Sequence, residues 1–196
     1  MTLSLKTHLK TRKSHPIAQL GEPGPDDSQI EELVAMASRV PDHGKLQPWR
    51  FILYRGDSRH EIGERLATRY AEVLGRPLAP GETDKELTRF SRAPVVIGVV
   101  YVPRDNPKIP EWEMLLSAGA AAMNLLHAAQ ALGFGANWIT NWYAEDAPSL
   151  AMLGLAPGER AVGFIHIGTP HGEAVERPRP DVSSILSEYA GPAGKG

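Results

Sequence analysis

The sequence contains no cysteine, so a disulfide scaffold, a thiolate metal site and a thiol nucleophile are all excluded. It also lacks an excess of charge of either sign, because 21 basic and 23 acidic residues leave a net charge of −2. We therefore expect neither a nucleic acid nor an anionic membrane as a partner. A chain without cysteine suits a reducing compartment, and we expect a cytoplasmic protein.

A long, uniformly apolar run that could cross a membrane is missing from the sequence. The most apolar segment, 115–132, carries Ser117, Asn124, His127 and Gln130, and is better explained as a helix buried within a protein. We expect His127 to be a core histidine with satisfied hydrogen bonds. The N-terminal stretch MTLSLKTHLKTRK lacks the continuous apolar core of a secretory signal.

Several motifs of known chemistry are absent as well. The sequence has neither the GxSxG of hydrolases nor the GxxxxGK[ST] of phosphate-binding loops. Its seven histidines form no HxxxH or HxH pair, so we expect no metal site. Gly133 and Gly135 stand between a predicted helix and a predicted strand, the reverse of the dinucleotide-binding order, and the third glycine is missing.

Hydrophobic periodicity predicts four or five strands and five or six helices. The predicted strands are apolar runs at 49–55, 94–102, 136–140 and 161–168. The predicted helices cover 3–12, the segment between Asp26 and Pro41, 58–73 with a capping box from Ser58 to Glu61, 84–91, 111–132 and 147–153. This mixture predicts an α+β layered fold in a single domain, 1–196, in which 171–196 form an extended C-terminal tail.

Two basic groups are candidates for a phosphate site. Arg12, Lys13 and Ser14 close the first predicted helix and bring a guanidinium, an ammonium and a hydroxyl close together. Arg177 and Arg179, in the tail, form the second group. The alternative is that both groups are ordinary solvated charges, one at a helix end and one in an extended tail.

The segment VPDHGKLQPWRF, residues 40–51, places polar residues at fixed positions just before a strand begins. The donors displayed along this segment and at the end of the preceding helix are Arg39, His43, Lys45 and Gln47. Donors along one edge, backed by the aromatic ring of Trp49, would suit a flat heteroaromatic ligand with carbonyls and ring nitrogens on its rim. The alternative is a polar loop with unrelated side chains.

These pieces together resemble the FMN-dependent nitroreductase superfamily. The segments that carry the resemblance are RKS at 12–14, PDHGKLQPWRF at 41–51, APVVIGVVY at 93–101, an Ala-rich helix ending in GFG, ANWIT at 136–140 and LGLAPGERAVGFIHIGTP at 153–170. The most specific is PDHGKLQPWRF, which is similar to the compact branch of the family. The resemblance covers residues 5–181. It implies a central, mostly antiparallel sheet flanked by helices, and an intertwined homodimer with two FMN sites at the subunit interface.

The resemblance also implies roles for individual residues. The phosphate of FMN would be held by Arg12, Lys13 and Ser14, with help from Arg177 or Arg179. The isoalloxazine would lie along Trp138, Ile139 and Thr140, and the nicotinamide cofactor would contact residues 128–133. The flavin would be reached from the partner subunit by Arg39 and His43. Further candidates for contact with the ring are Lys45, as a cation near N1 and O2, and Gln47.

Two departures from the family pattern affect these assignments. Lys13 stands where many members have arginine, and an ammonium cannot replace a bidentate guanidinium fork. Asp42, His43 and Lys45 stand where larger members have serine and asparagine. The hydrogen bonds at the N5 edge of the flavin, and with them the preferred acceptor, are therefore expected to differ from those of the larger members.

The activity implied by the resemblance is an FMN-dependent oxidation of NAD(P)H that reduces a small electron-poor acceptor, a nitroaromatic or a quinone, by a ping-pong mechanism. No protein nucleophile or general acid is required, so we name no catalytic residue. Two alternatives stay open. One is other flavin chemistry on the same scaffold, such as that of a dehydrogenase or dehalogenase, and the other is a flavin-binding dimer without enzymatic activity.

Overall fold

The computed structural model of the chain describes residues 4–189 and 191. Its centre is a five-stranded sheet in which β5 (Arg160–Pro170) pairs with three other strands. The strand order is β1 (Leu20–Gly21), β5, β3 (Val95–Tyr101) and β2 (Trp49–Arg55), and β4 (Gly135–Ile139) also pairs with β5. Every pairing is antiparallel, which confirms the expected kind of sheet.

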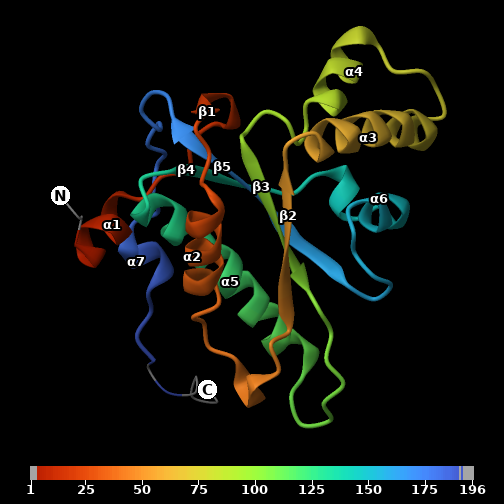
Figure 1. Ribbon diagram of the computed structural model, residues 1–196. Helices are drawn as coiled ribbons and strands as arrows, with labels where there is room; N and C mark the ends of the chain where they lie inside the picture. The colour runs from red at the N-terminus through yellow and green to blue at the C-terminus, as the bar shows by residue number, and fades with distance from the viewer. Residues whose placement is uncertain (1–3, 190, 192–196) are drawn as a thin grey trace, which may run out of the picture.

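Helices lie on both faces of this sheet (Figure 1). On one face are α2 (Asp27–Ala37) and α5 (Glu111–Ala131), and on the other are α3 (Ser58–Leu74) and α6 (Ala147–Met152). The remaining helices are α1 (Leu5–Thr11), α4 (Pro80–Leu87), α7 (Val182–Ile185) and the 3-10 turns η1 (Ile17–Gln19), η2 (His43–Lys45) and η3 (Trp142–Ala144). The predicted α+β layered fold is confirmed.

Strand β3 separates the two layers of helices. Val95, Ile97 and Val99 pack in the cluster formed with α2 and α5, whereas Val96 and Val100 pack in the cluster on the opposite face. All seven residues of the strand are buried. A nearly unbroken run of β-branched residues is typical of a strand that is covered on both faces, and β3 has this arrangement.

Small side chains allow α5 to lie close to the sheet. Its fully buried alanines are Ala118, Ala121, Ala122 and Ala129. The helix ends through Gly133, whose φ of 86° is readily adopted only by glycine, and the Phe134 amide donates to the Ala129 carbonyl at 2.9 Å. The chain then enters β4 directly, so the end of α5 and the start of β4 are adjacent.

Several predicted elements differ from the observed ones. α4 begins at Pro80 rather than at 84, because proline has the φ angle of a first helical turn. Ser58 forms no capping box, since its hydroxyl donates to the Arg55 carbonyl at 2.8 Å and the N-cap Asp57 makes no side-chain cap bond. The tail predicted as extended contains the one-turn helix α7, and its residues 190 and 192–196 lie outside the described part.

Strand β5 carries a polar side chain in the core. His166 is fully buried beside the ring of Phe90, with 6.1 Å between the ring centroids. Neither of its ring nitrogens has a hydrogen-bond partner within the described residues. Burial, followed by the positive charge of Arg92, lowers the pKa of His166 to about 3. The imidazole is therefore neutral in the folded protein at neutral pH.

We expect acid to destabilise the fold through His166. An unfolded histidine binds its proton near pH 6.5, whereas the folded protein protonates His166 only near a pKa of about 3. Because the folded pKa is the lower one, only the unfolded state takes up this proton as the pH falls below about 6.5. The free energy of unfolding is therefore at its full value above about pH 6.5 and falls by about 1.4 kcal/mol per pH unit on acidification. Urea unfolding between about pH 7 and pH 5 should show a smaller pH dependence for His166→Leu. Equal dependence in both proteins would contradict the assignment.

Candidate functional site

One small cavity gathers both basic groups that the sequence singles out. We call it the cation cavity. Its volume is about 260 Å³, and it is lined by Arg12, Lys13, Ser14, Val175, Arg177 and Arg179. Arg12 is the C-terminal cap of α1, and its amide donates to the His8 carbonyl at 2.8 Å. Arg177 and Arg179 follow β5, so the fold joins two segments from opposite ends of the chain.

Positive charge dominates the cation cavity. Burial, and then the guanidinium groups of Arg179 and Arg177, lower the pKa of Arg12, and only Glu176 acts in the opposite direction. The Glu176 carboxylate accepts hydrogen bonds from Arg179 at 3.0 and 3.1 Å and lies 3.8 Å from the Lys13 ammonium. One carboxylate thus faces four cationic side chains, and a bound phosphate would relieve the remaining repulsion.

The backbone of residues 13–15 is fixed from behind by α5 and β4. The Gln130 side-chain amide of α5 donates to the Lys13 carbonyl. The His15 amide donates to the Ala136 carbonyl of β4 at 3.1 Å, and the Asn137 side-chain amide donates to the His15 carbonyl. These contacts use backbone groups of the basic segment, so its charged side-chain ends stay available to a ligand.

Strand β4 leads away from this segment and carries Trp138 and Ile139, with Thr140 immediately after it. The Trp138 indole donates to the Val162 carbonyl at 3.2 Å and lies over Gly163, where a Cβ atom would be 2.0 Å from the indole nitrogen. The Ala136 carbonyl, which accepts the hydrogen bond from the His15 amide, lies on the edge of β4 that faces away from β5. Backbone groups of alternate strand residues point the same way, so the amide and carbonyl of Trp138 face this edge as well. This edge could hydrogen-bond the rim of a flat ring.

The turn between α2 and β2 is built around Asp42. Its carboxylate accepts hydrogen bonds from the amides of Leu46 and Gln47 at 3.1 and 2.8 Å. Two residues that are not glycine, Lys45 and Gln47, have φ angles of 54° and 48°, and such left-handed strain is concentrated at functional sites. The turn is thus held in one shape, with Lys45 and Gln47 exposed to solvent.

The structure of one chain does not bring this turn to the cation cavity. The His43 imidazole lies 2.7 Å from the Glu113 carboxylate near the start of α5, whereas His8 of α1 contacts His127 near the end of α5. At 1.5 Å per residue, positions 113 and 127 are about 21 Å apart along the helix. Figure 1 shows α1 and the chain that leads into β2 beside opposite ends of α5.

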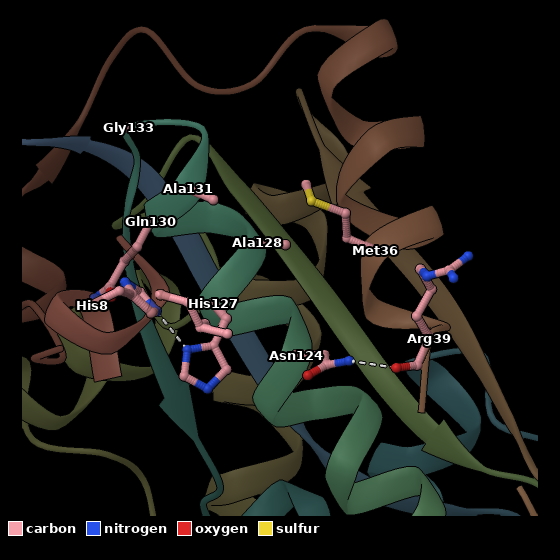
Figure 2. A pocket seen from close by; sticks show the side chains of 10 residues that line it. His8, Met36, Arg39, Asn124, His127, Ala128, Gln130, Ala131 and Gly133 are labelled. Atoms are coloured by element: carbon pink, nitrogen blue, oxygen red, sulfur yellow. Dashed lines mark hydrogen bonds between the residues drawn. The ribbon is translucent and has the colours of Figure 1, made fainter. Parts of the chain in front are cut away.

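Arg39 lies between these two regions. It follows α2 and lines a second cavity of about 630 Å³ between α1, α2 and α5 (Figure 2). Its carbonyl accepts a hydrogen bond from the Asn124 side-chain amide at 3.0 Å. The same cavity is lined by Ala128, Gln130, Ala131 and Gly133, all of which belong to the segment 128–133.

The expected core position of His127 is wrong. This histidine is half-buried on the cavity wall rather than in the core, and its Nδ1 lies 2.6 Å from Nε2 of His8 (Figure 2). The contacts from Gln130 and Asn137 to the basic segment were not predicted from the sequence. Polar residues at 127 and 130, one turn apart on an otherwise apolar helix, were the available signal, because such residues share one face.

Residues 4–189 and 191 contain neither a metal-binding group nor a membrane-spanning helix. No group of three or more histidine, aspartate or glutamate side chains is arranged to hold a metal ion. No helix combines the length and the apolar character that a membrane crossing requires.

Comparison with known proteins identifies the family. The Nitroreductase family model matches residues 10–169. "Putative NAD(P)H nitroreductase YdjA" of Escherichia coli (strain K12) is 33% identical over 162 residues, covering 80% of this chain and 84% of that protein. "Putative NAD(P)H nitroreductase" of Haemophilus influenzae is 36% identical over 164 residues, covering 83% and 86%.

A solved structure supports the same fold. The crystal structure of a "putative nitroreductase" from Desulfovibrio desulfuricans, in complex with FMN, aligns with a TM-score of 0.70 at 24% identity and covers 98% of this chain and 100% of that one. The family match over residues 10–169 and the two relatives show that the chain belongs to the Nitroreductase family.

Proposed function

We propose that the protein is an FMN-dependent oxidoreductase that uses NAD(P)H to reduce nitroaromatics, quinones or similar electron-poor acceptors. The observation that carries the proposal is the cation cavity, which joins Arg12, Lys13 and Ser14 to Arg177 and Arg179 at the start of the β4 edge. Family membership supports it, as do the names of the two relatives and the FMN complex of the structural neighbour.

The residues present fit an elongated ligand with a phosphate at one end and a flat ring at the other. Arg12, Lys13, Ser14 and Arg179 would hold the phosphate, since four cationic side chains surround a cavity with a single opposing carboxylate. The ring would lie along Trp138, Ile139 and Thr140, and the backbone groups of alternate residues such as Trp138, which point away from β5, would align it through hydrogen bonds. When bound, FMN supplies the hydride chemistry, and the protein supplies position and charge.

We further infer a homodimer in which each flavin site takes residues from both chains. His43, Lys45 and Gln47 lie far from the cation cavity of their own chain, and together with Arg39 they would reach the flavin of the partner subunit. Large apolar side chains that are at least 58% exposed support such a surface, and they include Leu5, Leu9, Trp112, Leu116, Ile185 and Tyr189. The cations of this second group would stabilise negative charge on the flavin near N1 and O2.

Arg12→Ala tests the phosphate assignment. A charge-assisted hydrogen bond contributes about 1.5–3 kcal/mol, so the variant should bind FMN roughly tenfold to a hundredfold more weakly in a fluorescence-quenching titration. Riboflavin, which lacks the phosphate, should lose much less affinity. Arg65→Ala, at an exposed position of α3, serves as the matched control and should bind both ligands normally. Equal losses for FMN and riboflavin would refute a phosphate role for Arg12.

The kinetic pattern tests whether donor and acceptor share one site. If NAD(P)H and the acceptor occupy the same place in turn, initial rates varied in both substrates should give parallel double-reciprocal lines. We expect this pattern with a quinone as acceptor. Intersecting lines would demonstrate a ternary complex and would rule out the ping-pong mechanism.

Mixed dimers test the two-chain site. Arg12→Ala and Arg39→Ala chains, each weak in FMN binding alone, should form on co-expression a dimer with one doubly altered site and one intact site. With random pairing about half of the dimers are mixed, so roughly a quarter of all sites should regain wild-type affinity. If Arg12 and Arg39 instead contributed to an FMN site within the same chain, every site would carry one substitution. Mixing would then restore wild-type affinity at no site. Native mass spectrometry verifies that the mixed dimers are present.

A further inference from the structure

His43 and Glu113 form an imidazole–carboxylate pair near the start of α5. Nδ1 of His43 lies 2.7 Å from the Glu113 carboxylate. An ionised carboxylate can only accept a hydrogen bond, so Nδ1 carries the proton of this contact. The other ring nitrogen, Nε2, has no hydrogen-bond partner among residues 4–189 and 191, and the side chain is 65% exposed. Nε2 is therefore the nitrogen at which this ring can take up and give up a proton.

The backbone on both sides of His43 is fixed by neighbouring segments. The Pro41 carbonyl accepts a hydrogen bond from the Ser117 hydroxyl of α5 at 2.7 Å. Gly44, with a φ of 73°, lies so close to Ile109 that a Cβ atom added at Gly44 would be 2.5 Å from the Ile109 Cδ1 atom. An imidazole held through both its backbone and its ring needs little reorganisation when it reacts.

The proposed reaction leaves the source of one proton open. Reduction of a quinone to a hydroquinone takes two electrons and two protons, whereas a hydride delivers two electrons and one proton. Water can supply the second proton, but a positioned acid typically accelerates such a step by about 10²–10⁴-fold. Histidine has this role more often than any other side chain, because it gains and loses a proton near neutral pH.

We propose that His43 is a catalytic residue, which donates this second proton to the acceptor, and that Glu113 is a positioning residue, which fixes the ring so that Nε2 is the donating nitrogen. The inference rests on the proposed function, including the two-chain site, since His43 would act at the flavin of the partner subunit. As the hydride reaches the acceptor, the Nε2–H bond of the imidazolium breaks, its electron pair stays on the nitrogen, and an O–H bond forms on the acceptor. The imidazole keeps its Nδ1–H bond to Glu113 and regains a proton at Nε2 from solvent.

The two halves of the reaction cycle should depend differently on this pair. Hydride transfer from NAD(P)H to the oxidised flavin needs no proton from the protein, because the hydride alone completes it. Reduction of a quinone needs the second proton, whereas reduction of ferricyanide takes one electron per ion and no proton. A quinone therefore reports on proton donation, and ferricyanide reports on electron transfer without it.

Stopped-flow re-oxidation of the reduced holoenzyme compares these two acceptors in wild type, His43→Gln and Glu113→Gln. The rate with a quinone should fall roughly a hundredfold in His43→Gln. It should fall roughly tenfold in Glu113→Gln, because an amide can donate to Nδ1 as well as accept from it and no longer enforces the Nδ1–H form. The rate with ferricyanide should change far less in both variants.

Glu64→Gln, at an exposed position of α3, is the matched control and should behave as wild type with both acceptors. Equal losses with the quinone and with ferricyanide would overturn the inference, since they would show a role in flavin binding rather than in proton donation. An unchanged quinone rate in His43→Gln would overturn it as well. A loss in His43→Gln alone would refute the positioning role of Glu113.

A second readout needs neither turnover nor flavin. Long-range ¹H–¹⁵N NMR spectra of the full-length protein without added flavin, at about pH 9 where an imidazole is neutral, should show His43 as the Nδ1–H tautomer in wild type. Glu113→Gln should also populate the Nε2–H tautomer, and a predominant Nε2–H form in wild type would overturn the inference. If NAD(P)H reduces no flavin in wild type, the proposed function fails, yet the tautomer still decides whether Glu113 positions His43. If wild type and both variants reduce a quinone equally fast, only the inference fails.

Discussion

The hydrogen bond from the His15 amide to the Ala136 carbonyl ties the candidate site to the sheet. β4 pairs with β5 along its whole length, and β5 also pairs with β3, the strand that is buried on both faces. The basic segment is therefore positioned by the central sheet, although it is itself close to the N-terminus and lies on the surface. A flexible attachment would leave the cationic groups free to move apart.

Their tendency to move apart is a physical cost of the site. Four cationic side chains around about 260 Å³, with one opposing carboxylate, repel one another in the folded protein. The segment keeps its place despite this repulsion because the side-chain amides of Gln130 and Asn137 donate to its backbone carbonyls. These contacts leave the charged side-chain ends free. A ligand that binds only the folded state stabilises it by an amount that grows with the logarithm of its affinity, and an anion would do so here. Preorganised repulsion of this kind favours a charged ligand over a neutral one.

The sequence predicts those features that depend on local pattern. The buried strand β3, the long alanine-rich helix and the basic triplet at residues 12–14 were identified because periodicity and residue type specify them. The capping box at Ser58 and the core position of His127 were wrong, because the Arg55 carbonyl competes for the serine hydroxyl and the partner of His127 is a residue far away in the chain. Contacts between distant segments leave little trace in local pattern, and the meeting of Arg12 with Arg177 and Arg179 was expected only from the family resemblance.

The turn at Asp42 extends the argument from one chain to two. Left-handed conformations at Lys45 and Gln47 cost of order 1–3 kcal/mol each, and they persist only where the surroundings determine them. Three contacts fix the conformation of this turn. They are the hydrogen bonds to the Asp42 carboxylate, the His43–Glu113 pair, and the hydrogen bond from the Arg104 guanidinium to the Gln47 carbonyl. All of these contacts come from the same chain, whereas the exposed side chains of Lys45 and Gln47 are distant from its own cation cavity. A strained, rigid turn that presents donors to solvent is accounted for if its ligand is held by a second copy of the chain.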